Sequence, residues 1–246
     1  MNRRTGTTRG NGDAGSLKGE LGALGSPEKA AHLSRFFKTG PGEYGEGDKF
    51  IGVQVPEQRR IAKRYANLPL DEIDRLMASP IHEHRLTGLL ILVEQFAKSQ
   101  QASSRREIVD FYLSRLERVN NWDLVDLSAP KLLGEHLVRH PEERAMLSTM
   151  AESTNLWERR VAVLATFPMI KQGQFDELLA LAEALLADTH DLMHKAVGWM
   201  LREAGKVDLA VLEEFLNRHA KTMPRTMLRY AVERLEPARR RYFMGR

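Results

Sequence analysis

The chain has 246 residues and no cysteine, which excludes disulfides, thiolate metal sites and thiol nucleophiles. Hydrophobic residues make up 42% of it and aromatic residues 7%, as in an ordinary globular protein. Lys and Arg exceed Asp and Glu by 37 to 33, so a polyanionic partner is indicated only if the cations cluster on one surface. The chain contains no run of about 18 apolar residues, which argues against a membrane span.

Residues 1–26 contain three arginines but no apolar run, so we do not expect this stretch to be a secretory signal. Because this stretch is rich in Gly, Thr and Ser, we expect a flexible tail. Ser26 and Pro27 then predict a helix start. Residues 40–47 form a glycine-rich loop, in which neighbouring acids oppose phosphate binding and favour a structured turn. Pro56 opens a basic helix that carries Arg59, Arg60, Lys63 and Arg64.

The rest of the chain alternates helical patterns with short breakers, and no alternating strand pattern occurs. The expected helices cover 70–77, 83–98, 105–119, 122–139, 142–152, 156–171, 175–187, 191–206, 209–221 and 225–235. Pro130 should kink or divide the helix that it interrupts. About a dozen helices joined by short loops predict an all-α fold of antiparallel helix pairs.

An internal echo indicates that these pairs are repeats. Asn121-Trp122-Asp123 and Asn155-Leu156-Trp157-Glu158 each place Asn, Trp and an acid at a helix start, with the tryptophans 157 − 122 = 35 residues apart. That spacing suits helical repeats, which stack into a curved solenoid with a concave binding surface. Helix starts favour Asn and acids in any case, so coincidence remains the alternative.

Three successive helices each place a tryptophan beside ionisable groups on one face. Trp122 precedes Asp126 by four residues, and Trp157 precedes Arg160 by three. The third helix carries Lys195, Trp199 and Arg202 on one stripe. Together they predict an aromatic, mostly cationic groove suited to nucleic acid. The alternative is core packing of the tryptophans beside solvated charges.

Asp126 is the unexpected member, because a carboxylate opposes binding of a phosphate backbone. Cleavage of an N-glycosidic bond would explain it, since a carboxylate stabilises the positive charge that develops on the sugar or orients the attacking water. An indole adds cation–π attraction, and a cationic alkylated base leaves as a neutral molecule. The alternative is a structural ion pair of Asp126 with Lys131 or Arg160.

Other clusters predict less. His82-Glu83-His84 lacks the spacing that aligns two metal ligands, and His136 and His140 are interpreted as surface histidines. Ser128 has no ordered His and acid partners, so a serine hydrolase is not indicated. Residues 237–246 are expected to form a basic tail that is solvated or grazes phosphate.

At these residues the sequence resembles the AlkD family of DNA alkylpurine glycosylases, which are built from HEAT-like helical repeats. The matching segments are NNWDLVD (Asn120 to Asp126), LWERRVAVL (Leu156 to Leu164) and KAVGWMLRE (Lys195 to Glu203), with FFKTGPGEYGEGDKFIGVQVPEQRR (Phe36 to Arg60) resembling the family's N-terminal signature. The resemblance covers roughly residues 28–236. It therefore implies an all-α HEAT-like solenoid with a concave basic groove and one glycosylase domain at 27–236.

The resemblance assigns the catalytic site residue by residue. Asp126 matches the catalytic aspartate, Trp122 the tryptophan one turn earlier, Arg160 the arginine of the next repeat and Trp199 the second site tryptophan. Helical geometry adds the phosphate contacts, which are Arg159, Lys195 and Arg202. Asn121 stands where members of the family often have a further aromatic residue, and this difference bears on the range of substrates or on the affinity for DNA.

The implied activity is monofunctional hydrolysis of cationic lesions such as 7-methylguanine and 3-methyladenine, with no metal or other cofactor. The implied partner is double-stranded DNA bound in a shallow groove, and we expect a cytoplasmic, nucleoid-associated monomer with no membrane partner. Two alternatives stay open: a non-catalytic binder of damaged or branched DNA, and a helical-repeat scaffold for protein interactions.

Overall fold

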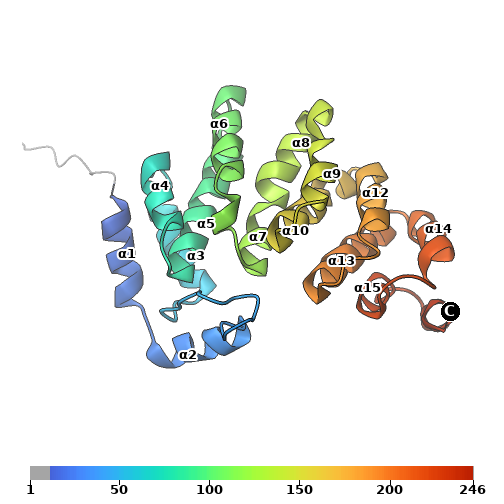
Figure 1. The fold of residues 1–246 in the computed structure, drawn as a ribbon. Helices are drawn as coiled ribbons and strands as arrows, with labels where there is room; N and C mark the ends of the chain where they lie inside the picture. The colour runs from blue at the N-terminus through green and yellow to red at the C-terminus, as the bar shows by residue number, and fades with distance from the viewer. Residues whose placement is uncertain (1–11, 246) are drawn as a thin grey trace, which may run out of the picture. The chain divides into compact units, whose positions relative to one another are not determined.

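The computed structural model describes residues 12–245, and these form helices and connecting loops with no strand; one isolated parallel bridge joins Lys49 to Ile81. An all-α fold built from successive helix pairs is thereby confirmed (Figure 1). The chain divides into two compact units, Met1–Ser99 and Gln100–Arg246, within the stretch that the sequence predicted as one domain. Among residues 12–245 no helix is long and apolar enough to cross a membrane.

The N-terminal unit contains five helices among its described residues: α1 (Ala14–Ala23), α2 (Pro27–Phe36), α3 (Val55–Arg64), α4 (Leu70–Met77) and α5 (His82–Lys98). Helix α5 lies at the centre of this unit, because α1, α3 and α4 all pack against it. Its side chains from His82 to Leu92 are buried, so both its polar first turns and its apolar middle lie inside the unit.

The segment that precedes the first expected helix differs from the prediction of a tail. Residues 14–23 form α1, which Asp13 caps by accepting a hydrogen bond from the backbone N–H of Ser16. Ala14, Leu17 and Leu21 share one face and are buried against the unit. The composition of this segment did not indicate a helix, because three glycines within it separate three apolar residues that stand at helical spacing. The part of the expected tail at residues 1–11 lies outside the described residues.

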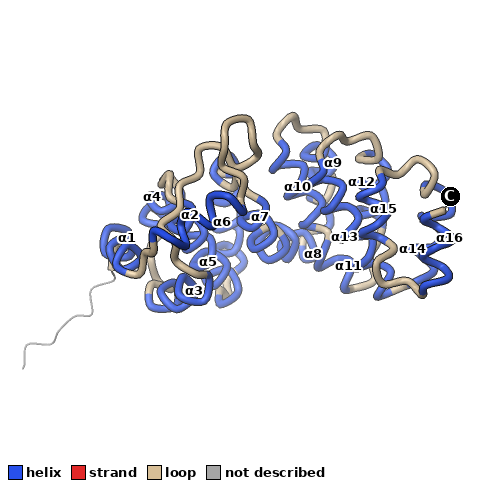
Figure 2. Tube along the Cα trace, turned by 90° about the horizontal axis from the view of Figure 1, so that it is seen from below, coloured by secondary structure: helices blue, strands red, loops and turns tan. Residues whose placement is uncertain are grey.

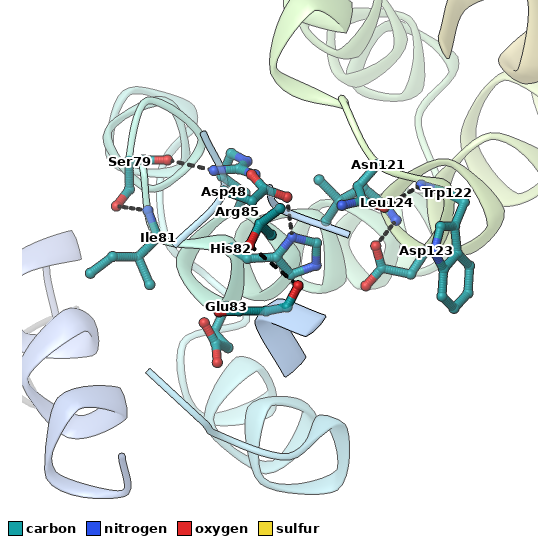
Figure 3. Close-up of polar contacts among 12 residues, drawn as sticks. Asp48, Ser79, Ile81, His82, Glu83, Arg85, Asn121, Trp122, Asp123 and Leu124 are labelled. Atoms are coloured by element: carbon teal, nitrogen blue, oxygen red, sulfur yellow. Dashed lines mark hydrogen bonds and ion pairs between the residues drawn. The ribbon is translucent and has the colours of Figure 1, made fainter. Parts of the chain in front are cut away.

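A buried polar cluster holds the loop between α2 and α3 (Figure 3). The Asp48 carboxylate pairs with Arg85 and lies 2.9 Å from Nδ1 of His82, and all three side chains are buried. Glu83, also buried, accepts the backbone N–H groups of residues 51–53 at 2.8 to 3.2 Å. Two further acids of the loop, Glu43 and Glu46, each accept a glycine N–H. The expected structured turn is confirmed, since its acids bind the loop's own backbone.

The C-terminal unit continues the helix pairs. Its elements are α6 (Ala102–Leu113), η1 (Leu116–Arg118), α7 (Trp122–Ser128), η2 (Pro130–Gly134), α8 (Glu135–Arg139), η3 (Pro141–Glu143), α9 (Met146–Ala151), α10 (Leu156–Ala165), α11 (Phe167–Lys171), α12 (Asp176–Ala184), α13 (Asp191–Val207), α14 (Leu209–His219), α15 (Arg225–Ala231) and α16 (Pro237–Met244). Helix α10 packs against both α7 and α13, and α13 packs against α15, so these four helices follow one another in a row (Figure 2).

The expected division at Pro130 is confirmed. Helix α7 ends at Ser128, and a π-helical turn at η2 carries the chain into α8. Gly134 lies so close to the next repeat that a Cβ atom there would meet the carbonyl oxygen of Ala165 at 2.6 Å. At the other end of the unit, residues 237–244 are helical and Phe243 is buried, so the expected basic tail is largely a packed helix.

Candidate functional site

The first helix of the candidate site is α7, which carries both Trp122 and Asp126. The buried side chain of Asn121 caps it by accepting the backbone N–H of Trp122 at 2.8 Å (Figure 3). Asn155 caps α10 in the same way, by accepting the N–H of Trp157 at 2.9 Å. The predicted helix starts are therefore confirmed, and each cap fixes the first turn that presents the tryptophan.

A bidentate ion pair joins α7 to α10. The Nε and Nη2 atoms of Arg160 each donate to one carboxylate oxygen of Asp126, both at 2.9 Å. The arginine side chain is 5% exposed and the aspartate side chain 19%. The guanidinium is therefore buried, while the aspartate side chain remains partly accessible to solvent. This fork-to-fork geometry fixes the plane of the carboxylate more strictly than a single contact would.

Arg160 also reaches the third helix of the row. Its Nη1 atom donates to the carbonyl oxygen of Leu192, in the first turn of α13, at 2.6 Å. One guanidinium thus connects α7, α10 and α13. The Leu192 carbonyl is a neighbour of the candidate site that the sequence could not reveal, because a backbone acceptor carries no residue-type signal.

The environment of Asp126 perturbs its acidity. Burial raises the pKa of Asp126 above the ordinary value for an aspartate, and the nearby charge of Asp123 raises it further. The charge and hydrogen bonds of Arg160 act in the opposite direction without cancelling the rise. The site therefore holds a carboxylate that is costlier to ionise than a solvated one and is fixed in orientation by a cation.

The three tryptophans differ in burial. Trp122 and Trp199 are half-buried, whereas Trp157 is only 8% exposed and belongs to the core. For Trp157 the core-packing alternative is confirmed and the groove interpretation is wrong. The indole N–H of Trp199 donates to Glu203 at 3.0 Å, and its ring lies 6.4 Å from that of Phe167. Glu203 could have been found from the sequence, since it stands four residues after Trp199 on the same helix.

The predicted phosphate contacts already have acidic partners. Lys195 pairs with Asp191 at 2.7 Å, one turn earlier on α13, and Arg202 pairs with Glu233. Arg159 donates at 2.8 Å to Asp188; the side chain of Arg159 is 17% exposed and that of Asp188 is 5% exposed. All three roles stay predictions, and a phosphate would have to displace an acid at each of them.

The remaining sequence candidates have structural roles or form a separate cluster. Ser128 is buried, and its hydroxyl bonds the Tyr112 hydroxyl at 3.0 Å and the Leu124 carbonyl at 2.6 Å. Among the described residues, His140, Glu142 and Glu143 bring three possible metal-ligand atoms within 4.8 Å of one another. Glu143 is already engaged there by Arg106 at 2.7 Å and by His136 at 3.1 Å.

Comparison with known proteins agrees with this fold. The profile of a protein family described as "DNA alkylation repair enzyme" matches residues 17–235. A solved structure described as a predicted DNA alkylation repair enzyme from Enterococcus faecalis superposes with a TM-score of 0.70 at 19% identity, covering 87% of this chain and 98% of that one. The crystal structure of smu.31 from Streptococcus mutans UA159 superposes with a TM-score of 0.54 at 16% identity, covering 85% and 98%. Comparison with curated proteins gave no match.

Proposed function

Because the chain belongs to the family of DNA alkylation repair enzymes, with DNA as the implied substrate, we propose that it is a monofunctional DNA glycosylase that removes cationic alkylated purines. The proposed reaction is hydrolysis of the N-glycosidic bond of lesions such as 7-methylguanine and 3-methyladenine in duplex DNA. The proposal uses side chains and water alone, and it has the chain act as a monomer in the cytoplasm, at the nucleoid.

The observation that carries the proposal is the bidentate Asp126–Arg160 pair, in which the arginine is buried and the aspartate side chain is 19% exposed. As the glycosidic bond of a cationic lesion breaks, the base leaves neutral and positive charge develops on the deoxyribose. A fixed carboxylate stabilises that charge or orients the attacking water, because its position needs no reorganisation during the reaction. Arg160 acts in this proposal as the residue that holds the carboxylate plane.

The two half-buried tryptophans support the same reaction. Trp122 lies one turn before Asp126 on α7, so its indole face is near the place where a sugar cation would form. An indole attracts a cation over its ring and offers a flat surface to a deoxyribose. Trp199 is held by Glu203 and is proposed to contact the substrate from α13.

The proposal is tested by base release from methylated duplex DNA under single-turnover conditions. We expect the wild-type chain to release 7-methylguanine, and Asp126→Asn to release it about 10²- to 10³-fold more slowly, the usual cost of one electrostatic stabiliser. The matched control is Asp176→Asn, the same substitution at an exposed residue of α12. Undiminished release by Asp126→Asn would overturn the assigned role.

The second candidate function is a non-catalytic binder of damaged or branched DNA. The observation that favours it is that Arg160 already neutralises Asp126, as in a structural ion pair. The same assay separates the two functions, since a binder retains salt-dependent DNA affinity and releases no base. A protein-interaction scaffold, in contrast, would show neither property.

A further inference from the structure

The exposed face of α3 carries four cations that the Asp126 site does not use. Arg59, Arg60, Lys63 and Arg64 are all exposed, whereas Gln58, Ile61 and Ala62 of the same helix are buried. At 3.6 residues per turn, the four cations are centred opposite the buried side chains. We call this strip of four residues the α3 cationic face.

Hydrogen bonds fix the direction in which this face points. The buried Gln58 donates to the carbonyl oxygen of Val53 at 2.8 Å and accepts a hydrogen bond from the Thr87 hydroxyl of α5 at 3.3 Å. Residues 51–53, which lead into the helix, are held by the Glu83 carboxylate. Helix α3 also packs against α5 and α1 within the N-terminal unit. These contacts fix the rotation of α3 about its own axis, so its cations keep their direction within the N-terminal unit.

The charges on this face are incompletely neutralised by their own unit. Arg60 pairs with Glu57, and Arg64 pairs with Glu20 of α1. Among residues 12–245 neither Arg59 nor Lys63 forms an ion pair; the acid near Lys63 is Glu94, which pairs with Lys98 of α5. Four cations against the two paired acids leave an excess of two positive charges.

This arrangement costs stability in the free protein. Arg59 and Lys63 are four residues apart, as are Arg60 and Arg64, and like charges at this spacing destabilise a helix. A polyanion that binds across the face converts this repulsion into attraction. Arg and Lys side chains on a rigid helix contact phosphates without reading sequence.

We propose that the α3 cationic face binds the phosphate backbone of duplex DNA, as a contact separate from the Asp126 site. The inference rests on the proposed function only in taking DNA as the substrate. Because phosphate contacts carry no base information, this surface adds affinity for any duplex and leaves the selection of lesions to the chemistry at Asp126.

The test uses the double variant Arg59→Gln/Lys63→Gln, which removes the two cations without an ion pair and changes no buried side chain. Its affinity for undamaged duplex DNA is measured across a salt series and compared with the wild type. The association constant falls as salt rises, and each phosphate contact makes the slope of log K against log salt steeper by about 0.9. The slope of the double variant should therefore be shallower than that of the wild type by about 1.8. The affinity gap between variant and wild type should then shrink about tenfold between 50 and 200 mM salt.

The matched control is Lys29→Gln/Arg75→Gln, which makes the same change in net charge at exposed residues of α2 and α4. We expect the control to keep the wild-type slope. An equal fall in slope in the control, or an unchanged slope in the α3 variant, would overturn the proposal. Binding of the α3 face to an acidic protein or an anionic vesicle, with DNA affinity unaffected, would overturn it as well.

Base release separates this inference from the proposed function. With lesion DNA at saturating concentration, the α3 variant should release 7-methylguanine at the wild-type single-turnover rate, because Asp126 is untouched. If the wild type releases no base while the salt slope still falls in the variant, the α3 face stands and the glycosylase proposal fails. The opposite pattern, with release confirmed and the slope unchanged, removes the α3 face alone.

Discussion

The Asp126–Arg160 pair makes a quantitative prediction for a double-mutant cycle. Each residue is the partner that compensates the other's buried charge, with two hydrogen bonds of 2.9 Å between them and an arginine that is 5% exposed. Removing one partner of a buried pair costs about 3–5 kcal/mol, because the other charge is left uncompensated. We therefore expect Asp126→Asn and Arg160→Gln each to lower the free energy of unfolding by a few kcal/mol.

The double variant is expected to lose much less than the sum of the two. Once both charges are absent, no buried charge remains unpaired, although the contact of Arg160 with the Leu192 carbonyl is still lost. The coupling free energy should be at least about 2 kcal/mol, within the range found for residues that share one ion pair. Urea unfolding followed by circular dichroism at neutral pH measures all four proteins. Losses that add to within about 0.5 kcal/mol would refute the buried pairing.

Three further predictions concern acidity and backbone strain. Burial raises the pKa of Asp126, and the carboxylate is the active form in the proposed reaction, so base release should decline as pH falls through a pKa above that of an ordinary aspartate. The rate is measured after subtraction of the release that occurs without enzyme. A rate that stays flat down to pH 4 would contradict the role of Asp126. Burial, with Lys18 and Arg85 nearby, lowers the pKa of His84 to about 4, so the unfolded chain binds the proton first and stability is lost as pH falls from about 6.5 to about 4. The expected loss is about 2 kcal/mol between pH 7.5 and 5, and urea unfolding should show that His84→Gln removes most of it. Gly52→Ala should lower the free energy of unfolding by at least about 2 kcal/mol, because φ of Gly52 is +82° and a Cβ atom there would meet a backbone oxygen at 2.2 Å. Gly47→Ala is the control for the effect of φ alone, because φ of Gly47 is +89° and a Cβ atom there would meet nothing within 4 Å. Equal losses in the two variants would show that the close approach at Gly52 is unimportant.

Helical periodicity and cap residues predicted much of the fold. Helix α4 begins and ends where the pattern places it, and the Asn121 and Asn155 caps form as expected. These features depend on neighbours a few residues apart, which the sequence displays directly. Helix α1 was missed, because its many glycines outweighed a short apolar stripe that only the packing against α3, α4 and α5 makes worthwhile.

The candidate site was predictable in its residue types and not in its contacts. The sequence offered Lys131 and Arg160 as partners of Asp126, and tertiary packing of α7 on α10 brings in Arg160. The same packing buries Trp157, although its spacing resembles that of Trp122. Which tryptophan faces solvent depends on the neighbouring helices, and a single sequence does not contain that information.

The measurement that tests the central claim most directly is single-turnover release of 7-methylguanine from methylated duplex DNA by the wild type and by Asp126→Asn. Both proteins are first shown to be folded at the assay temperature and to bind the duplex with equal affinity. The account predicts release by the wild type and a rate lower by about 10²–10³ in the variant. Equal rates for the two folded proteins, or no release by either, would contradict it.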